Sequence, residues 1–317
     1  MGAFIVRRLL QAVPVVFGIS ILLFVLMHAM PGGPLAMYAH QPGMTRQALN
    51  QIAAAYGINQ PVWVQYVDWL GHAVQGNFGY SYIYQVPAAQ MMLQRMPATA
   101  ELMGTAFVIA LIAAFLLGIL SAMRQYSVWD YMVTVISYLG MSLPTFFLGI
   151  VAIIVFAVEL HWLPTGGQIS VTGSNGIGSY LIHLIMPACV LAIFTLAQWS
   201  RYIRSSMLEV INADYIRTAR AKGATERSVI WRHALRNALL PVVTVIVLDG
   251  AFLAGGALVT ETIFAWPGMG RLFYQAISQS DYPVMMVIVS FLSIVIVVAN
   301  IVADVLYGVL DPRVSYS

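Results

Sequence analysis

The sequence predicts an all-α, polytopic membrane protein with six transmembrane helices. Hydrophobic residues make up 60% of its 317 positions and charged residues only 9%, whereas soluble domains carry about 25% charged residues. A helix needs roughly 20 apolar residues to cross a hydrocarbon core about 30 Å thick. Continuous apolar stretches of this length indicate helices rather than barrel strands, because lipid offers the backbone no hydrogen-bond partners. The six candidate spans are Leu9–Met30, Leu102–Met123, Tyr131–Leu160, Tyr180–Trp199, Ala238–Val259 and Pro283–Val309.

The first candidate span is predicted to stay in the membrane and not to be a cleaved signal peptide. Its apolar run is too long for the hydrophobic region of such a peptide. A proline- and glycine-rich sequence, Pro31 to Pro34, follows it in place of a small-residue cleavage site.

The distribution of basic residues predicts that both termini are cytoplasmic. Eight Lys and Arg residues lie between Arg201 and Arg236, and an excess of Lys and Arg marks the cytoplasmic side of a membrane protein. The net charge of +3 therefore reflects topology and does not indicate nucleic-acid binding. The remaining cytoplasmic residues are Arg7, Arg8, Arg124 and Arg313, and those assigned to the external side are Arg46, Arg95 and Arg271.

Residues 31–97 form a predicted external segment. Within it, Thr45 is a candidate N-cap, Leu49, Ile52 and Ala53 share one helix face, and Gly57 is a helix stop. A group of aromatic residues follows, which fits either the interfacial belt of a membrane protein or a docking surface for an external partner. The group is Trp63, Tyr66, Trp69, Phe78, Tyr80, Tyr82 and Tyr84.

A short polar helix is predicted between the fourth and fifth spans. Asn212 is a candidate N-cap, Asp214 places a negative charge in the first turn, and Lys222 lies in the last turn before Gly223. Gly223 can adopt the left-handed conformation that ends many helices. A polar helix at the membrane face suggests a surface that a partner protein binds. The alternative is an ordinary basic cytoplasmic loop.

The residues needed for ATP binding or catalysis are not evident. A phosphate-binding P-loop requires Lys followed by Ser or Thr, but the single lysine, Lys222, is followed by Gly223. His183 and Cys189 are too scattered to predict a metal site. The sequence therefore predicts a non-catalytic chain that binds no cofactor.

Polar residues within or near the spans are the other candidate functional residues, since charge in lipid is costly. They are Glu101, Asp249, Asn300 and Asp304. A proton or ion relay in a secondary transporter would use such residues. The alternative is that Glu101 and Asp304 pair near helix ends, which leaves Asp249 as the one central carboxylate.

Three long motifs, in order along the chain, resemble those of the dipeptide/oligopeptide permease family of bacterial ABC importers. They are Asp214–Gly223, His233–Thr244 and Glu261–Gly270. Shorter matches extend the resemblance over nearly the whole chain: Gly57–Pro61, Gly76–Gly79, Trp162–Gly167 and Asp304–Arg313. The sequence departs from the family where Gly33 and Asn77 replace acidic residues, and the general permease loop motif is matched only at Ala219 and Gly223.

The resemblance implies a type I ABC importer permease fold in the bacterial cytoplasmic (inner) membrane. It implies a cytoplasmic N-terminus and first helix (1–30), the external segment (31–97), and a five-helix permease core (98–317) with an ATPase-coupling helix at about 212–223. The implied coupling residues are Asp214, Tyr215, Ile216, Arg217, Ala219, Arg220, Lys222 and Gly223.

The resemblance also implies the partners and the cargo. The chain would pair with a second homologous permease, bind two cytoplasmic ABC ATPases that carry ATP and Mg²⁺, and receive cargo from an external substrate-binding protein. It would form half of the pathway for di- or oligopeptides; glutathione, a nickel chelate or another small solute are alternatives. A proton-coupled secondary transporter and an intramembrane enzyme are the competing classes.

Overall fold

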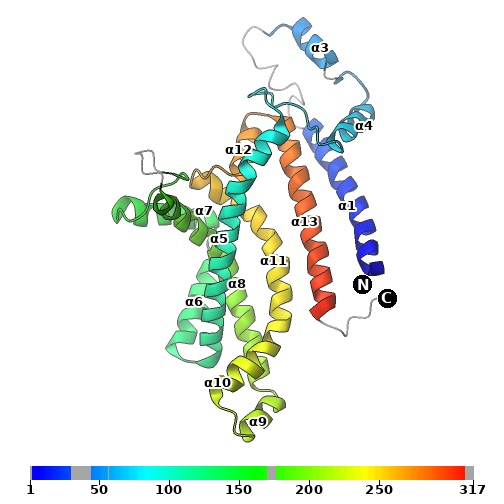
Figure 1. The fold of residues 1–317 in the computed structure, drawn as a ribbon. Helices are drawn as coiled ribbons and strands as arrows, with labels where there is room; N and C mark the ends of the chain where they lie inside the picture. Colours follow the sequence, from blue (N-terminus) through cyan, green and yellow to red (C-terminus); the bar gives the residue numbers. More distant parts are fainter. Residues whose placement is uncertain (1, 30–43, 56, 170–175, 311–317) are drawn as a thin grey trace. The chain divides into compact units, whose positions relative to one another are not determined.

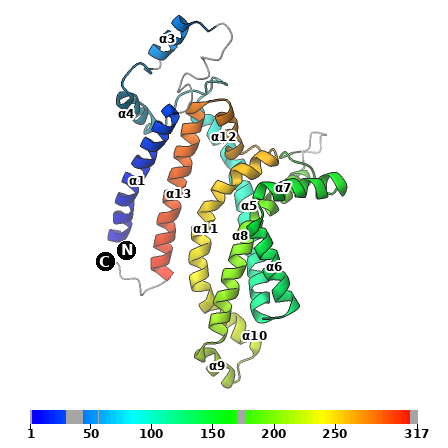
Figure 2. The same ribbon diagram turned by 180° about the vertical axis from the view of Figure 1, so that it is seen from behind.

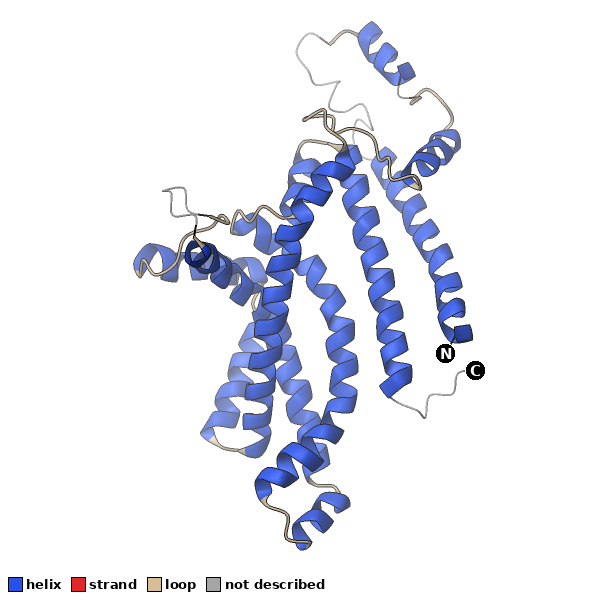
Figure 3. Ribbon diagram, in the orientation of Figure 1, coloured by secondary structure: helices blue, strands red, loops and turns tan. Residues whose placement is uncertain are grey.

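Helices form nearly all of the protein in a computed structural model that describes residues 2–29, 44–55, 57–169 and 176–310 (Figure 3). In these ranges the one strand-like pairing is a single antiparallel bridge between Tyr80 and Pro87. The all-α prediction is confirmed. The predicted features at Pro31–Pro34, Gly33 and Asp311–Arg313 lie outside the described residues.

The chain divides into two compact units, which are described separately. The first comprises Met1–Thr99 and Pro267–Val298, and the second comprises Ala100–Trp266 and Ala299–Ser317. Two of the three boundaries fall inside the long helices α5 (Ala88–Met123) and α13 (Tyr282–Leu310), and the third, between Trp266 and Pro267, falls between helices.

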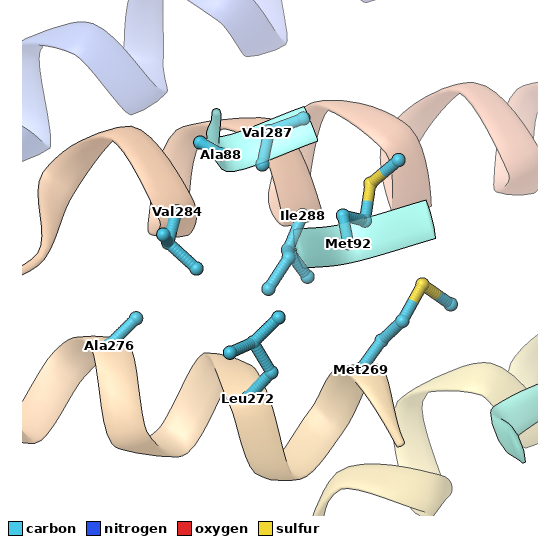
Figure 4. Close-up of a cluster of buried hydrophobic side chains, with 8 residues drawn as sticks. All are labelled: Ala88, Met92, Met269, Leu272, Ala276, Val284, Val287 and Ile288. Atoms are coloured by element: carbon cyan, nitrogen blue, oxygen red, sulfur yellow. The ribbon is translucent and has the colours of Figure 1, made fainter. Parts of the chain in front are cut away.

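The first unit contains α1 (Gly2–Ala29), α3 (Arg46–Ala55), α4 (Val62–Ala73) and α12 (Met269–Ser278), with the adjoining parts of α5 and α13 (Figure 1). Its main core lies where α12 packs on α13 and on the start of α5. Figure 4 shows Met269 and Leu272 of α12 pointing toward Met92 and Ile288. No helix was predicted between the spans Ala238–Val259 and Pro283–Val309, so α12 is an additional element.

The external segment has the helix that was predicted for it. Thr45 Oγ1 accepts a hydrogen bond from the Ala48 N–H at 3.2 Å, Ala53 is buried, and Gly57 has a φ of 66°. These features confirm α3 and its caps, because each depends only on residues within one or two turns.

The aromatic group of the external segment splits into two sets. Tyr66 and Trp69 pack on Phe24 of α1 with ring centroids 5.4 and 5.8 Å away, and the Tyr66 hydroxyl shares a 2.7 Å hydrogen bond with Ser20. By contrast, Trp63 and Tyr80 are largely exposed. The first set therefore holds α4 against α1, and only the second set is available to other molecules.

The second unit is a helical bundle, in which α8 (Ile177–Ile211) runs beside α11 (Leu235–Ile263) and α6 (Val128–Ser142) (Figures 1 and 2). Small residues allow close approach, as is common between helices in lipid. A Cβ on Gly140 of α6 would lie 2.9 Å from Ile193 Cγ2 of α8. A hydrogen bond of 3.1 Å joins Ser137 to Ser200 across the same contact.

The third candidate span, Tyr131–Leu160, is not one continuous helix. It consists of α6, α7 (Thr145–Ala152) and the π-helix η2 (Ile153–Glu159), and the two parts are bent by 108°. The bend lies at Leu143, which has extended φ and ψ angles of −89° and 130°. The ring of the following residue, Pro144, disfavours the helical conformation at Leu143, which explains the break.

The number of spans depends on how bent helices are counted. Four helices in the described ranges are long and apolar enough to cross a membrane, and the number rises to six if each of two bent pairs is one span. The second pair, Glu226–Leu239 and Pro241–Val247, is bent by 48°, where Pro241 lacks the N–H of a regular helix. The fourth span is also longer than predicted, because α8 continues from Trp199 to Ile211.

Gly118 on α5 is expected to tolerate no side chain. A Cβ there would lie 2.8 Å from Ile203 Cβ and 2.8 Å from the Ser200 backbone oxygen on α8. We expect Gly118→Ala to destabilise the chain by about 1–3 kcal/mol through overpacking, measured by unfolding in detergent. The matched control is Gly104→Ala on the same helix, where nothing lies within 4 Å. Equal stability of the two variants would contradict this contact.

Candidate functional site

The predicted polar helix is present as α9 (Asp214–Ala221), which directly follows α8. Its predicted N-cap is wrong. The Asn212 side chain turns back to donate a 2.9 Å hydrogen bond to Leu208 O at the end of α8. Ala213 occupies the N-cap position with extended backbone angles and no side-chain hydrogen bond. The chain therefore passes from α8 to α9 through one extended residue.

The end of α9 has the predicted left-handed glycine. Gly223 has a φ of 83°, its N–H donates to Arg220 O at 2.9 Å, and the Ala224 N–H donates to Ala219 O at 3.2 Å. This pair of hydrogen bonds is the Schellman arrangement, which satisfies the last helical carbonyls. It turns the chain sharply into the following segment.

The two faces of α9 differ in burial. Ile216 is fully buried within the chain, and α9 packs on the π-helix η3 (Val229–Ala234). Asp214, Arg217 and Thr218 are exposed, Tyr215 is 46% exposed, and Ala219 is half-buried. Of the implied coupling residues, Ile216 thus faces its own chain, and the accessible side of α9 is formed by its neighbours.

Polar contacts fix the segment that returns from α9 to the bundle. Arg220 of α9 pairs with Glu226 of α10 (Glu226–Ser228), with Nε–Oε1 at 2.8 Å and Nη2–Oε2 at 3.3 Å. Both side chains are partly exposed, so this pair contributes at most about 1 kcal/mol. Its bidentate geometry nevertheless sets the direction of the turn.

A buried ion pair joins α6 to α8 close to the end of α8 that precedes α9. The sequence analysis did not predict it. Arg204 of α8 donates to both oxygens of Asp130 on α6, at 2.7 and 2.9 Å. Asp130 also accepts hydrogen bonds from the Ser121 hydroxyl of α5 and from the Tyr126 N–H. Three helices thus meet at one carboxylate, whose side chain is 4% exposed. From the sequence alone, Asp130 would be interpreted as a capping residue of α6, because it lies three positions after the N-cap Ser127.

Two of the intramembrane candidates are far apart. Glu101 accepts a 2.5 Å hydrogen bond from the Tyr180 hydroxyl, and Asp249 accepts a 3.0 Å hydrogen bond from the Trp199 indole N–H. Tyr180 and Trp199 both lie on α8, 19 residues apart, which corresponds to about 28 Å along a helix. Glu101 and Asp249 therefore do not form a proton-transfer pair.

The other two candidates lie on α13. Asn300 is exposed and Asp304 is half-buried, one turn apart on the same helix. The described contacts do not bring the four polar residues together at one site. The hydrogen-bonded ion pairs described above lie instead at the contact of α5, α6 and α8 and beside α9.

Removal of one partner of the Asp130–Arg204 pair is predicted to be strongly destabilising. Arg204→Met leaves a buried carboxylate without its cation and should cost roughly 3 kcal/mol, at the low end for a broken buried pair because Arg204 is 28% exposed. Unfolding titrations in mixed micelles would measure this.

The double variant Asp130→Asn with Arg204→Met is the control, because it removes both charges. The amide oxygen introduced at position 130 can still accept the hydrogen bond from the Ser121 hydroxyl, so most of the stability should return. If Arg204→Met alone stays within about 0.5 kcal/mol of the natural chain, where surface substitutions fall, the pair does not hold the helices together.

Several apolar helices that are long enough to cross a membrane define the class as multi-pass membrane proteins. The chain belongs to the family of binding-protein-dependent transport system inner membrane components, whose model matches residues 114–316. The model of the N-terminal part of such membrane components matches residues 1–103. The chain is thus a transport subunit and not an enzyme, and the family implies a complex with other ABC transporter components.

Full-length relatives and a solved structure agree with this assignment. The chain is 44% identical over 317 residues to the oligopeptide transport system permease protein AppB of Bacillus subtilis (strain 168), covering 100% of both chains. It is 40% identical over 311 residues to a putative peptide permease protein of Brucella suis biovar 1 (strain 1330), covering 98% of both. A crystal structure of an amino acid ABC transporter with histidines matches with a TM-score of 0.52 at 11% identity. That match covers 69% of this chain and 93% of the other, and it shows the fold alone.

Proposed function

We propose that this chain forms half of the translocation pathway of an ATP-driven peptide importer. A second homologous permease would form the other half, and an external substrate-binding protein would deliver the cargo. Two cytoplasmic ABC ATPases would bind ATP and Mg²⁺. The peptide cargo is proposed from the names of the full-length relatives, which are 36–44% identical to this chain.

The exposed face of α9 is the observation that supports an ATPase partner. One side of α9 is anchored by Ile216 to its own chain, and the other side presents Tyr215, Arg217 and Thr218. Exposed Tyr and Arg are the residues most enriched among binding hot spots. Beside the helix, an open hollow of about 550 Å³ is lined by Thr225, Arg227, Ser228 and the exposed Trp231.

The anchoring explains how such a surface would transmit movement. α9 follows α8 after two residues, Asn212 and the extended Ala213, and α8 is tied to α6 by Asp130 and Arg204. A displacement of α9 by a partner would therefore move packed helices as a body. ATP can drive such a change only if the ATPases bind the two states with different affinity.

The external segment supports contact with a binding protein. Within the first unit, Asp281 holds this segment in place, because its carboxylate accepts hydrogen bonds from the Ser81 hydroxyl and the Tyr82 N–H. Trp63, Tyr80 and Tyr84 remain exposed on this anchored segment. A fixed segment with exposed aromatic side chains suits a docking surface better than a simple connector does.

The proposed topology places both termini and α9 in the cytoplasm and residues 31–97 outside. In a Cys189→Ser background, we expect Gln60→Cys to react with a membrane-impermeant maleimide in intact spheroplasts. Lys222→Cys, exposed on the C-cap of α9, is the matched control and should react only after lysis. The reverse labelling pattern would exclude this topology.

The ATPase-docking role of α9 is tested by Tyr215→Ala. Truncation of a hot-spot aromatic costs about 2 kcal/mol or more, which corresponds to at least a ten-fold loss of affinity at about 1.4 kcal/mol per ten-fold. We expect loss of ATPase co-purification and of ATP-driven uptake without loss of stability, since the side chain is 46% exposed. Thr218→Arg, which adds bulk on the same face, should act in the same way.

Tyr84→Ala is the matched control for this experiment. Tyr84 is 52% exposed but lies in the external segment, so its truncation should leave ATPase association unchanged. Ala219→Glu is a less specific test, because Ala219 is half-buried and a charge there would also disturb the chain's own packing. Full uptake and normal ATPase association in both Tyr215→Ala and Thr218→Arg would show that α9 does not dock the ATPase.

A further inference from the structure

A polar cavity of about 470 Å³ lies between α6 and α8, outside the α9 surface. Its size is within the range of small-molecule sites, which is about 300–1,000 Å³. Hydroxyl, amide and guanidinium groups line most of it, and none of the lining residues is acidic. They are Thr134, Tyr138, Met141, Gln198, Arg201, Tyr202, Arg204 and Ser205.

Of the two arginines that line this cavity, only one is paired with a carboxylate among the described residues. Arg204 is neutralised by Asp130. The guanidinium carbon of Arg201 lies 4.5 Å from the centroid of the Tyr138 ring, and Nη1 lies 3.6 Å from the Met141 sulfur. Among the described residues, no carboxylate pairs with Arg201. The cavity therefore carries a net positive charge, and the Tyr138 ring fixes the position of the Arg201 guanidinium that supplies it.

The position of Arg201 along α8 corresponds to the headgroup level of a membrane. The group formed by Glu101, Gln168 and Tyr180 marks the polar edge at the start of α8. Arg201 follows Tyr180 by 21 residues, about 31 Å along a helix, and the hydrocarbon core is about 30 Å thick. Two further exposed aromatics, Trp129 and Tyr131, lie in the first turn of α6, and the exposed Tyr138 lies beside Arg201 itself, as in interfacial belts.

The surface next to the cavity is apolar. On α6, Met132, Val135, Ile136 and Leu139 are each about half exposed. A ligand that places an anion on Arg201 would therefore have apolar protein surface beside it, toward the hydrocarbon core. A phospholipid has this combination of a phosphate and acyl chains, whereas a free phosphate would use only the polar part.

We propose that the α6–α8 cavity binds the headgroup of an anionic phospholipid, with Arg201 as the phosphate ligand. Gln198, Tyr202 and Ser205 supply further hydrogen-bond donors to the headgroup oxygens, and the acyl chains lie on the apolar face of α6. With the topology proposed above, the lipid belongs to the cytoplasmic leaflet. The leaflet rests on that topology, whereas the site itself rests on the cavity, its charge and its depth.

Native mass spectrometry of the purified full-length chain, with defined lipids added, tests the proposal. We expect phosphatidylglycerol to bind, phosphatidylcholine to bind at least ten-fold more weakly, and Arg201→Gln to lose at least ten-fold in phosphatidylglycerol affinity, about 1.4 kcal/mol. Arg201→Lys should recover part of it, because the charge is kept. The matched control is Arg124→Gln, an exposed arginine in the α5–α6 turn outside the cavity, which should bind as the natural chain does.

The remaining arms separate the possible outcomes. Equal phosphatidylglycerol binding by Arg201→Gln and the natural chain would overturn the site. Competition by inorganic phosphate at an affinity equal to that of the lipid would show an anion site and not a lipid site. Loss of binding on assembly with a second permease subunit would show that the cavity is a protein interface. ATPase co-purification, which depends on Tyr215 and not on Arg201, reports separately on the proposed function.

Discussion

The ion pair between Asp130 and Arg204 is the contact on which the part of the second unit next to α9 depends. Asp130 receives hydrogen bonds from α5, from the turn before α6 and from α8, so one carboxylate joins three helices. Burial of a charge is costly unless it is paired and hydrogen-bonded. Both oxygens of the Asp130 carboxylate are hydrogen-bonded, and hydrogen bonds, unlike apolar contacts, require a defined geometry. The ion pair therefore sets the register of α8 against α6 just before α9 begins.

Local features of the structure could be predicted from sequence, because they depend on residues within one or two turns. Thr45 and Gly57 delimit α3 as expected, and Gly223 ends α9 in the left-handed conformation. The apolar stretches also indicated a helical membrane protein. The break in the third candidate span could have been predicted from Pro144, because the residue before a proline avoids the helical conformation. The hydrophobicity of the span by itself gives no information on helix direction.

Features that join distant parts of the chain could not be predicted. Asp130 and Arg204 are 74 residues apart, and Ser81 and Asp281 are 200 residues apart. No periodic pattern links such positions. The orientation of α9 could not be predicted for the same reason: Ile216 is apolar, so from the sequence alone it fits a partner's groove as well as its own chain's core. Only the packing of α9 on η3 shows which of the two it fills.

The close contact of Gly118 with Ile203 divides α8 into two unequal arms. Eight residues separate Ile203 from Ile211 at the α9 end, about 12 Å, and 26 residues separate it from Ile177, about 39 Å. A rigid tilt of α8 about this crossing displaces the Ile177 end roughly three times as far as the α9 end, by the ratio of these lengths. In such a tilt, the short arm of α8 lies beside the proposed ATPase surface, and the long arm reaches the polar group around Glu101.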